Sequence, residues 1–186
     1  MRKIVFTLGV SLDGYFEGPN REIDWHMVDD EVHGHFNDFL GEMSAFLEGR
    51  VTYELMTAYW PTADQDPEAD PRTVEFARIW RRTPKYVYSK TLQQADENAT
   101  IVRDVVKEEV EALKVLPGGD MAVGGPDLVA EFRRLGLIDE YRVYVTPIIL
   151  GAGRPMFLPG ERIDLKLIET RTFGNGLVLL RYVPTG

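Results

Sequence analysis

Three short turns contain the residue types that could bind a negatively charged ligand. The most informative is Gly124-Gly125-Pro126-Asp127, which lies between an apolar strand and an expected helix. Glycine lets a ligand approach the backbone closely, and proline suits the first turn of a helix. The free N–H groups and the positive end of the helix dipole would then face a pyrophosphate. A plain tight turn is the alternative interpretation, and the G-x-G-x-x-G dinucleotide fingerprint is absent.

Two further turns add cations at the same kind of position. Residues 49–52 begin with glycine and place Arg50 at the start of an expected helix, where a phosphate could bind. Residues 89–91 follow a short strand and offer Lys90 between two hydroxyl groups, which suits an adenosine 2′-phosphate. Ordinary surface side chains explain each turn when it is taken alone. Because open α/β sheets bind ligands beyond the carboxyl ends of their strands, the three turns together predict a ligand site there.

Other reactive residue types form weaker patterns. His33 and His35 would point apart on a helix and have no evident carboxylate partner, so we expect no metal site. The acidic run at residues 29–31 could supply an acid to a cleft, although acids are also favoured at the start of a helix. Trp25 could form the wall of a site for a flat ligand or belong to the core. Ser11 has no nearby base that would support a Ser-His-Asp arrangement.

Hydrophobic spacing predicts the elements that must position these turns. Apolar residues 4–10 indicate a buried first strand, and the spacing over residues 29–47 indicates a helix. Proline-rich residues 61–71 indicate a surface loop. Further strands are predicted at residues 85–89, 100–103, 121–123, 140–150, 165–172 and 177–183, and further helices from residue 49, at 73–82, at 105–116 and after Pro126. Strands separated by helices imply parallel pairing, and the hairpin turn at residues 174–176 implies an antiparallel edge. The pattern is typical of an α/β sheet with helices on both faces.

The composition limits the classes of function. A length of 186 residues predicts one domain spanning 1–186, and the lack of cysteine excludes disulfides, thiolate nucleophiles and cysteine metal sites. With 21 basic and 30 acidic side chains, the net charge of −9 argues against nucleic acid or a membrane surface as partner. The longest apolar run, residues 145–150, is far short of the ~20 residues of a membrane span. No signal peptide is evident, so we expect a cytoplasmic location.

The motifs, in their order along the chain, resemble those of the dihydrofolate reductase superfamily. They are most similar to its bacterial branch that shares the C-terminal reductase domain of riboflavin biosynthesis. The matching segments are Ile4-Val5-Phe6, Ser11-Leu12-Asp13-Gly14, Asp24-Trp25, Gly49-Arg50-Val51-Thr52-Tyr53-Glu54, Tyr86-Val87-Tyr88-Ser89-Lys90, Val123-Gly124-Gly125-Pro126, and Tyr144 through Gly151. The resemblance implies a dihydrofolate-reductase-like fold: a mainly parallel, eight-stranded sheet with an antiparallel C-terminal edge and an NADPH site across the strand ends.

The same resemblance implies roles for individual residues. Cofactor-binding residues would be Val10, Gly14, Gly49, Arg50, Thr52, Ser89, Lys90, Gly124, Gly125 and Pro126. Trp25 would stand at the substrate cleft, and the helix after it would face the substrate. Dihydrofolate reductases have a carboxylate on that helix, and the family spacing places this position near His33 instead. The resemblance thus makes Trp25 and His33 the candidate substrate-binding residues. Asp13 and Asp30 are therefore the candidate catalytic acids.

The predicted function is that of an NADPH-dependent reductase. The substrate would be a small heterocycle, such as a pterin or a diaminopyrimidinone, or a sugar phosphate, and the reaction would be of the dihydrofolate or 5-amino-6-(5-phosphoribosylamino)uracil reductase type. One alternative is a non-catalytic module that binds NADPH or another ligand on the same fold. Another is a metal-dependent hydrolase that uses the three histidines. A homodimer is predicted from the resemblance, from the apolar run at residues 145–150 and from the C-terminal strands at the sheet edge.

Overall fold

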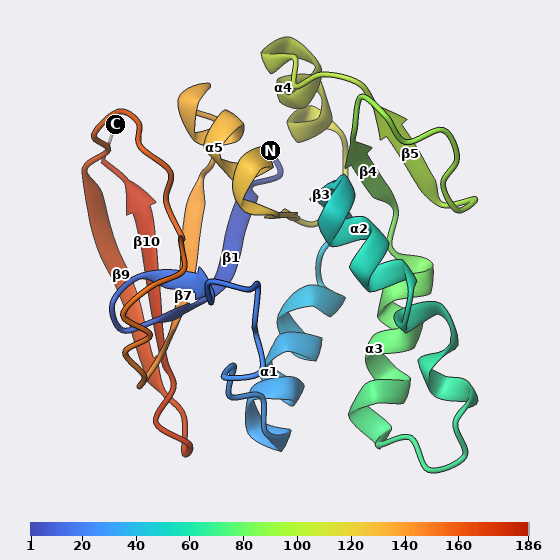
Figure 1. The fold of residues 1–186 in the computed structure, drawn as a ribbon. Helices are drawn as coiled ribbons and strands as arrows, with labels where there is room; N and C mark the ends of the chain where they lie inside the picture. Colours follow the sequence, from blue (N-terminus) through green and yellow to red (C-terminus); the bar gives the residue numbers. More distant parts are fainter. Residues whose placement is uncertain (186) are drawn as a thin grey trace.

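An eight-stranded sheet organises the chain, in a computed structural model that describes residues 1–185 (Figure 1). Six neighbouring strands are parallel to one another, and β10 runs antiparallel to both of its neighbours. This arrangement confirms the mainly parallel sheet with an antiparallel C-terminal edge. Across the sheet the strands are β5 (Ala99–Val102), β4 (Lys85–Tyr88), β3 (Ala45–Gly49), β6 (Met121–Gly124), β1 (Ile4–Ser11), β7 (Glu140–Thr146), β10 (Val178–Pro184) and β9 (Leu165–Thr172).

Helices cover both faces of the sheet, as predicted. Successive side chains of a strand point to opposite faces, so Val5 and its neighbour Phe6 belong to two different hydrophobic clusters. The cluster of Phe6 is closed by α4 (Lys107–Val115) and α5 (Pro126–Arg134). The cluster of Val5 is closed by α1 (Asp30–Gly41), α2 (Arg50–Thr57) and α3 (Pro71–Arg82). The sheet is therefore the middle layer of three.

One sequence prediction is wrong at a central position. The helix expected over residues 29–47 ends at Gly41, and residues 45–49 form strand β3 instead. This strand pairs with β4 on one side and β6 on the other, and its first four residues are buried. The apolar residues of the strand continued the helical spacing of α1, and only the pairing with two other strands distinguishes them from a helix.

Smaller elements also differ from the prediction. Strands β2 (Tyr15–Glu17) and β8 (Arg154–Pro155) form an unpredicted antiparallel ribbon. A 3-10 helix (Trp60–Gln65) occupies part of the predicted loop at residues 61–71, and the strand predicted to reach residue 150 ends at Thr146. Within the described residues, 1–185, we find no helix long and apolar enough to cross a membrane.

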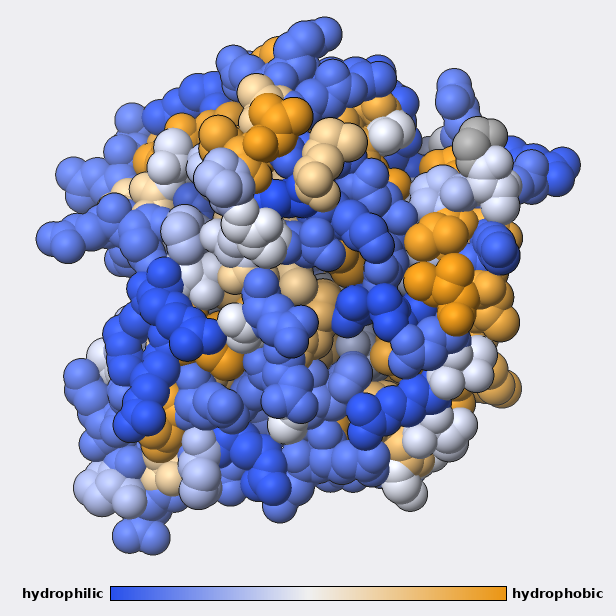
Figure 2. Space-filling model, turned by 180° about the vertical axis from the view of Figure 1, so that it is seen from behind, coloured by the Kyte–Doolittle hydropathy of each residue, from blue (hydrophilic) through white to orange (hydrophobic). Residues whose placement is uncertain are grey.

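The β9 edge of the sheet is exposed along its whole length. All eight of its residues are exposed, among them the apolar side chains Leu165, Leu167 and Ile168. Figure 2, which views the molecule from behind, shows hydrophobic residues gathered on the side where β9 and β10 lie. An exposed edge strand with apolar side chains is a ready surface for pairing with another chain.

Candidate active site

A cavity lies beyond the carboxyl ends of β3, β4 and β6. Its volume is about 980 Å³, and its lining includes Gly49 at the end of β3, Ser89 just after β4 and Gly124 at the end of β6. These are the three predicted turns, which the parallel pairing of the strands brings to one edge of the sheet. Eight of the predicted residues line this one cavity: Gly49, Arg50, Thr52, Ser89, Lys90, Gly124, Gly125 and Pro126.

The turn at Gly49 and the turn at Gly125 contact each other beyond the carboxyl ends of β3 and β6. Gly125 has a φ of +92°, and a β-carbon on it would lie 3.0 Å from Thr52 Oγ1 and 3.6 Å from the Gly49 nitrogen. Neither Gly49 nor Gly125 caps its helix through a side chain, so the first N–H groups of α2 and α5 have no side-chain acceptor. The positive ends of two helix dipoles thus converge on one place, which fits the two negative charges of a pyrophosphate.

Two cations of the cavity wall, Arg50 and Lys90, form ion pairs with acids of the protein. Arg50 forms an ion pair with Glu54 at 2.8 Å, one helical turn away. Lys90 lies 3.1 Å from Asp104, and both side chains are mostly exposed. Because exposed ion pairs contribute little free energy, either cation is available to an incoming phosphate.

The turn after β4 has a defined shape. The Ser89 hydroxyl oxygen accepts hydrogen bonds from the backbone N–H groups of Thr91, at 3.2 Å, and Leu92, at 3.0 Å. Arg103 donates to the carbonyl oxygens of Ser89 and Leu92 at 2.9 and 2.7 Å. The turn is therefore fixed before any ligand arrives, which lowers the entropy lost on binding.

The residues predicted to lie near the nicotinamide lie outside the cavity wall. Asp13 accepts hydrogen bonds from the backbone N–H groups of Leu150 and Gly151, at 3.1 and 2.8 Å, and from the Ser11 hydroxyl at 2.7 Å. The hydrogen bond from Ser11 is the largest cause of the lowered pKa of Asp13. Asp13 thus fastens the turn after β7, and neither it, Val10 nor Gly14 is part of the cavity wall. Their functional roles stay predictions.

The other predicted residues lie on α1 and in the loop before it. Asp30 is exposed and forms an ion pair with Arg72 at 3.3 Å. Asp29 accepts from the Val32 N–H group and caps the helix, so the acidic run acts as a helix start here. His33 packs edge-on against Trp60. The Trp25 indole donates to the Glu22 carbonyl oxygen at 3.0 Å.

Trp25, Asp29, Asp30 and His33 do not line the cavity. The residue of α1 that does line it is Leu40. Catalysis by Asp30 and substrate binding by Trp25 and His33 therefore stay predictions without geometric support. The described residues, 1–185, also contain no group of three or more His, Cys, Asp and Glu that could hold a metal ion.

Two buried ionisable residues of this region were missed by the sequence reasoning. Glu48 on β3 lines the cavity, and only 6% of it is exposed. Burial raises the pKa of Glu48 to about 8. Lys85 on the adjacent β4 donates to the carbonyl oxygens of Trp80 and Thr83, and burial lowers its pKa to about 8. A lone acid next to apolar residues was the available signal for Glu48, but the residues directly before it, up to Leu47, were predicted as helix.

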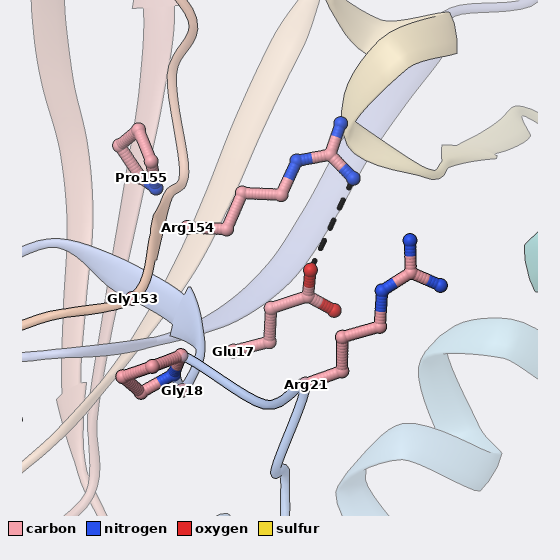
Figure 3. Close-up of a pocket in the computed structure, with 7 residues that line it drawn as sticks. Glu17, Gly18, Arg21, Gly153, Arg154 and Pro155 are labelled. Atoms are coloured by element: carbon pink, nitrogen blue, oxygen red, sulfur yellow. Dashed lines mark ion pairs between the residues drawn. The ribbon is translucent and has the colours of Figure 1, made fainter.

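Two arginines, Arg21 and Arg154, lie where the cavity adjoins a second hollow. This second hollow is shallower, with a volume of about 460 Å³, and Glu17, Arg21 and Arg154 line both. Figure 3 shows the guanidinium groups of Arg21 and Arg154 extending toward the same side of this hollow, with the ion pair from Arg154 to Glu17 dashed. Arg154 also lies 2.5 Å from Asp127 in the first turn of α5. The β2–β8 ribbon is thereby attached to the helix whose N-terminus faces the cavity.

Comparison with known proteins places these features in a family. The sequence pattern of the family described as RibD C-terminal domain matches residues 2–179. Among curated proteins, the uncharacterized protein YyaP of Bacillus subtilis (strain 168) is 38% identical over 183 residues, which is 97% of this chain and 94% of YyaP.

Solved structures share the fold at lower identity. A protein from Shewanella sp. PV-4, assigned to riboflavin biosynthesis, is similar with a TM-score of 0.77, 21% identity and full coverage of both chains. Dihydrofolate reductase from Enterococcus faecalis, solved with NADP(H), is similar with a TM-score of 0.65 and 13% identity over 99% of this chain and 97% of that one. At these identities the likeness concerns the fold, and it confirms the dihydrofolate-reductase-like architecture.

Proposed function

The chain belongs to the RibD C-terminal domain family, and from this premise we propose that it is an NADPH-dependent reductase of a small heterocyclic or sugar-phosphate substrate. The observation that carries the proposal is the convergence of two uncapped helix N-termini, at Gly49 and Gly125, on a cavity of about 980 Å³. Glycine at both positions leaves the backbone N–H groups open to a ligand. The family relation to reductases supplies the reaction class.

The residues of the cavity wall fit the parts of a dinucleotide. The N–H groups after Gly125 and Gly49 would hold the pyrophosphate, as the absence of β-carbons at this contact allows. Arg50 and Lys90 would bind phosphate by charge-assisted hydrogen bonds, Lys90 that of the 2′ position. Thr52 would fix the distance between the two turns. The chemistry supplied by this cofactor, when it is bound, is transfer of a hydride.

The protein's own part in such a reaction is to bind, to orient and to exclude water. Apolar side chains of the cavity, including Leu40, Phe76 and Trp80, would surround the substrate ring and keep solvent from it. Titration of the protein with NADPH in a calorimeter tests the proposal. We expect saturable binding, and the absence of any heat would remove its basis.

One observation favours the non-catalytic alternative. The predicted catalytic acids are engaged elsewhere, Asp13 by the turn at residues 150–151 and Asp30 by Arg72. A module that only binds NADPH would show the calorimetric signal without turnover. Loss of the absorbance of reduced nicotinamide in the presence of pterins, pyrimidines or small aldehydes distinguishes the reductase from the module.

We also propose that the protein forms a homodimer through β9. The strand is an unpaired sheet edge with three exposed apolar side chains, Leu165, Leu167 and Ile168. Pairing with a second copy would satisfy its free backbone groups and cover these side chains.

A further inference from the structure

Glu48 on β3 lies beside a glycine of the neighbouring strand β6, in the part of the sheet that lines the cavity. Its register partner on β6 is Gly124, and Phe6 on β1 is the partner of the preceding residue, Val123. Thr7 therefore follows on β1 at the level of Gly124. Adjacent strands are about 4.8 Å apart, so the backbones of Glu48 and Thr7 stand about 10 Å from each other with the glycine between them.

Glu48 lies among aromatic and aliphatic side chains on one face of the sheet. Phe46 and Glu48 are two residues apart on β3, so their side chains point to the same face of the sheet. This is the face covered by α1, α2 and α3. Phe46 stacks on Trp80, with ring centroids 5.8 Å apart. Leu40, Met56 and Phe76 belong to the same apolar cluster as Phe46 and also line the cavity. The surroundings of Glu48 on this face of the sheet are therefore mainly apolar.

Polar atoms of Glu48 and Thr7 are not satisfied by the protein. Within the described residues, 1–185, the buried oxygens Glu48 Oε2 and Thr7 Oγ1 have no hydrogen-bond partner. The phenol of Tyr144 lies near the Thr7 hydroxyl, and Thr7 contributes to the pKa of that phenol, but the two groups lack the geometry of a hydrogen bond. Unsatisfied buried groups are rare in folded proteins, and two of them line the same cavity here.

Lys85 does not satisfy Glu48. Its ammonium group donates to the carbonyl oxygens of Trp80 and Thr83 and lies 4.3 Å from the centre of the Trp80 ring. Its positive charge lowers the pKa of Glu48, but burial is the larger effect and keeps that pKa near 8. At pH 7 the side chain of Glu48 is therefore mainly a neutral acid, with an O–H donor beside a C=O acceptor.

We propose that Glu48 orients the substrate ring, and that it selects a flat nitrogen heterocycle whose edge presents an N–H group beside a carbonyl oxygen. Such an edge complements a neutral carboxylic acid with two hydrogen bonds, whereas a carboxylate would select a cationic edge with two donors. The inference rests on the proposed reductase function, because it takes the cavity as the substrate site. Glu48 acts here as a positioning and specificity residue.

Three small probes test this pairing in the full chain. 2-Quinolone carries the N–H and C=O edge, N-methyl-2-quinolone keeps the flat surface without the N–H group, and benzamidine is a flat cation with two donors. Their affinities at pH 7 are measured by calorimetry for the wild type, Glu48→Gln and Glu48→Leu. The first variant keeps a donor beside an acceptor in its side-chain amide, whereas the second removes both.

We expect the wild type to bind 2-quinolone about 10-fold more tightly than the N-methyl compound and than benzamidine. Glu48→Gln should retain this preference and Glu48→Leu should lose it. Equal affinities in the wild type, no binding of 2-quinolone, or a preference that persists in Glu48→Leu would overturn the proposal. An infrared band of a protonated carboxyl group should be present in the wild type at pH 6 and absent in Glu48→Gln, and its absence from the wild type would also overturn it.

A parallel titration with NADPH separates this inference from the proposed function. If all three proteins bind NADPH and the probes ignore Glu48, the assignment of Glu48 is wrong and the cofactor proposal stands. If no protein binds NADPH but the quinolone preference holds, the cofactor proposal is wrong and the role of Glu48 stands.

Discussion

The hydroxyl oxygen of Thr52 lies 3.0 Å from the place that a β-carbon on Gly125 would occupy. This contact joins the turn after β3 to the turn after β6, two segments more than seventy residues apart in sequence. Each turn starts a helix whose first N–H groups face the cavity. A side chain at Gly125 would therefore change the spacing of the two turns, and with it the proposed pyrophosphate site.

Gly125→Ala should weaken NADPH binding by 10-fold or more and lower the free energy of unfolding by about 1–3 kcal/mol, because alanine is strained at this φ and contacts Thr52. Gly136→Ala is the matched control, since Gly136 also has a positive φ, of +66°, but has open space around it. The control should be destabilised without losing affinity. Calorimetry and urea unfolding measure the two effects, and equal losses of affinity in both variants would contradict the assignment.

Lys90→Ala should weaken NADPH binding roughly 10-fold and leave NADH binding nearly unchanged, because a charge-assisted hydrogen bond to the 2′-phosphate is lost. The exposed pair with Asp104 contributes little to stability, so the fold should not suffer. Lys3→Ala, at an exposed position before β1 and thus at the opposite end of the strand from the cavity, serves as the control for a lost positive charge. If NADPH and NADH lose affinity equally, Lys90 does not contact the 2′-phosphate.

Glu48→Gln should stabilise the protein increasingly as the pH rises from about 4.5 to about 8. The folded pKa of Glu48 is raised to about 8 from 4.5, so in this window the folded wild type holds a proton that the unfolded chain has released. Wild-type stability therefore falls with pH, by roughly 1.4 kcal/mol per pH unit for one such group. Glutamine does not titrate and removes this loss.

Urea unfolding at pH 5 and pH 7.5 measures the difference between the two proteins. Glu108→Gln, at an exposed position of α4, is the control and should show no such trend. A constant difference between wild type and Glu48→Gln at both pH values would mean that Glu48 is already ionised at pH 5.

Asp13→Ala should loosen the turn after β7, because two backbone N–H groups lose their acceptor. We expect faster amide hydrogen exchange at Leu150 and Gly151, which mass spectrometry of peptides can follow. Asp24→Ala, at an exposed position in the loop before α1, is the control. Unchanged exchange together with a complete loss of turnover would instead support the catalytic role predicted for Asp13.

Leu167→Glu should convert the proposed homodimer into a monomer, because it places a charge on the apolar edge strand β9. Light scattering at micromolar concentration distinguishes the two states. Leu12→Glu changes an exposed leucine away from β9 and should leave the dimer intact. A monomeric wild type would show that the β9 edge is not paired in solution.

Local sequence patterns were enough to predict most of the helices and strands and three of the turns. Apolar or alternating segments predicted β1, β6 and β9 nearly to the residue, because each segment is short and is followed within a few residues by a turn that contains glycine. The strand–Gly124-Gly125-Pro126–helix pattern was local in the same way, and so were the turns at Arg50 and Lys90. The family resemblance then supplied the architecture that these local signals could not.

Which residues lie next to one another at the cavity depends on tertiary contacts that the sequence patterns did not reveal. Strand β3 follows α1 without a glycine or proline in the connection, so its apolar residues up to Leu47 continued the helical spacing, and Glu48 directly followed the predicted helix. Pairing with β4 and β6 turned that segment into the centre of the sheet and placed Glu48 beside Gly124 and near Lys85. In the folded protein Asp13 binds the backbone of the turn after β7, and Asp30 is exposed to solvent. Hydrophobic periodicity indicates which side of a helix or strand is apolar. Which strands pair with each other depends on contacts between residues far apart in the chain, and no local pattern contains that information.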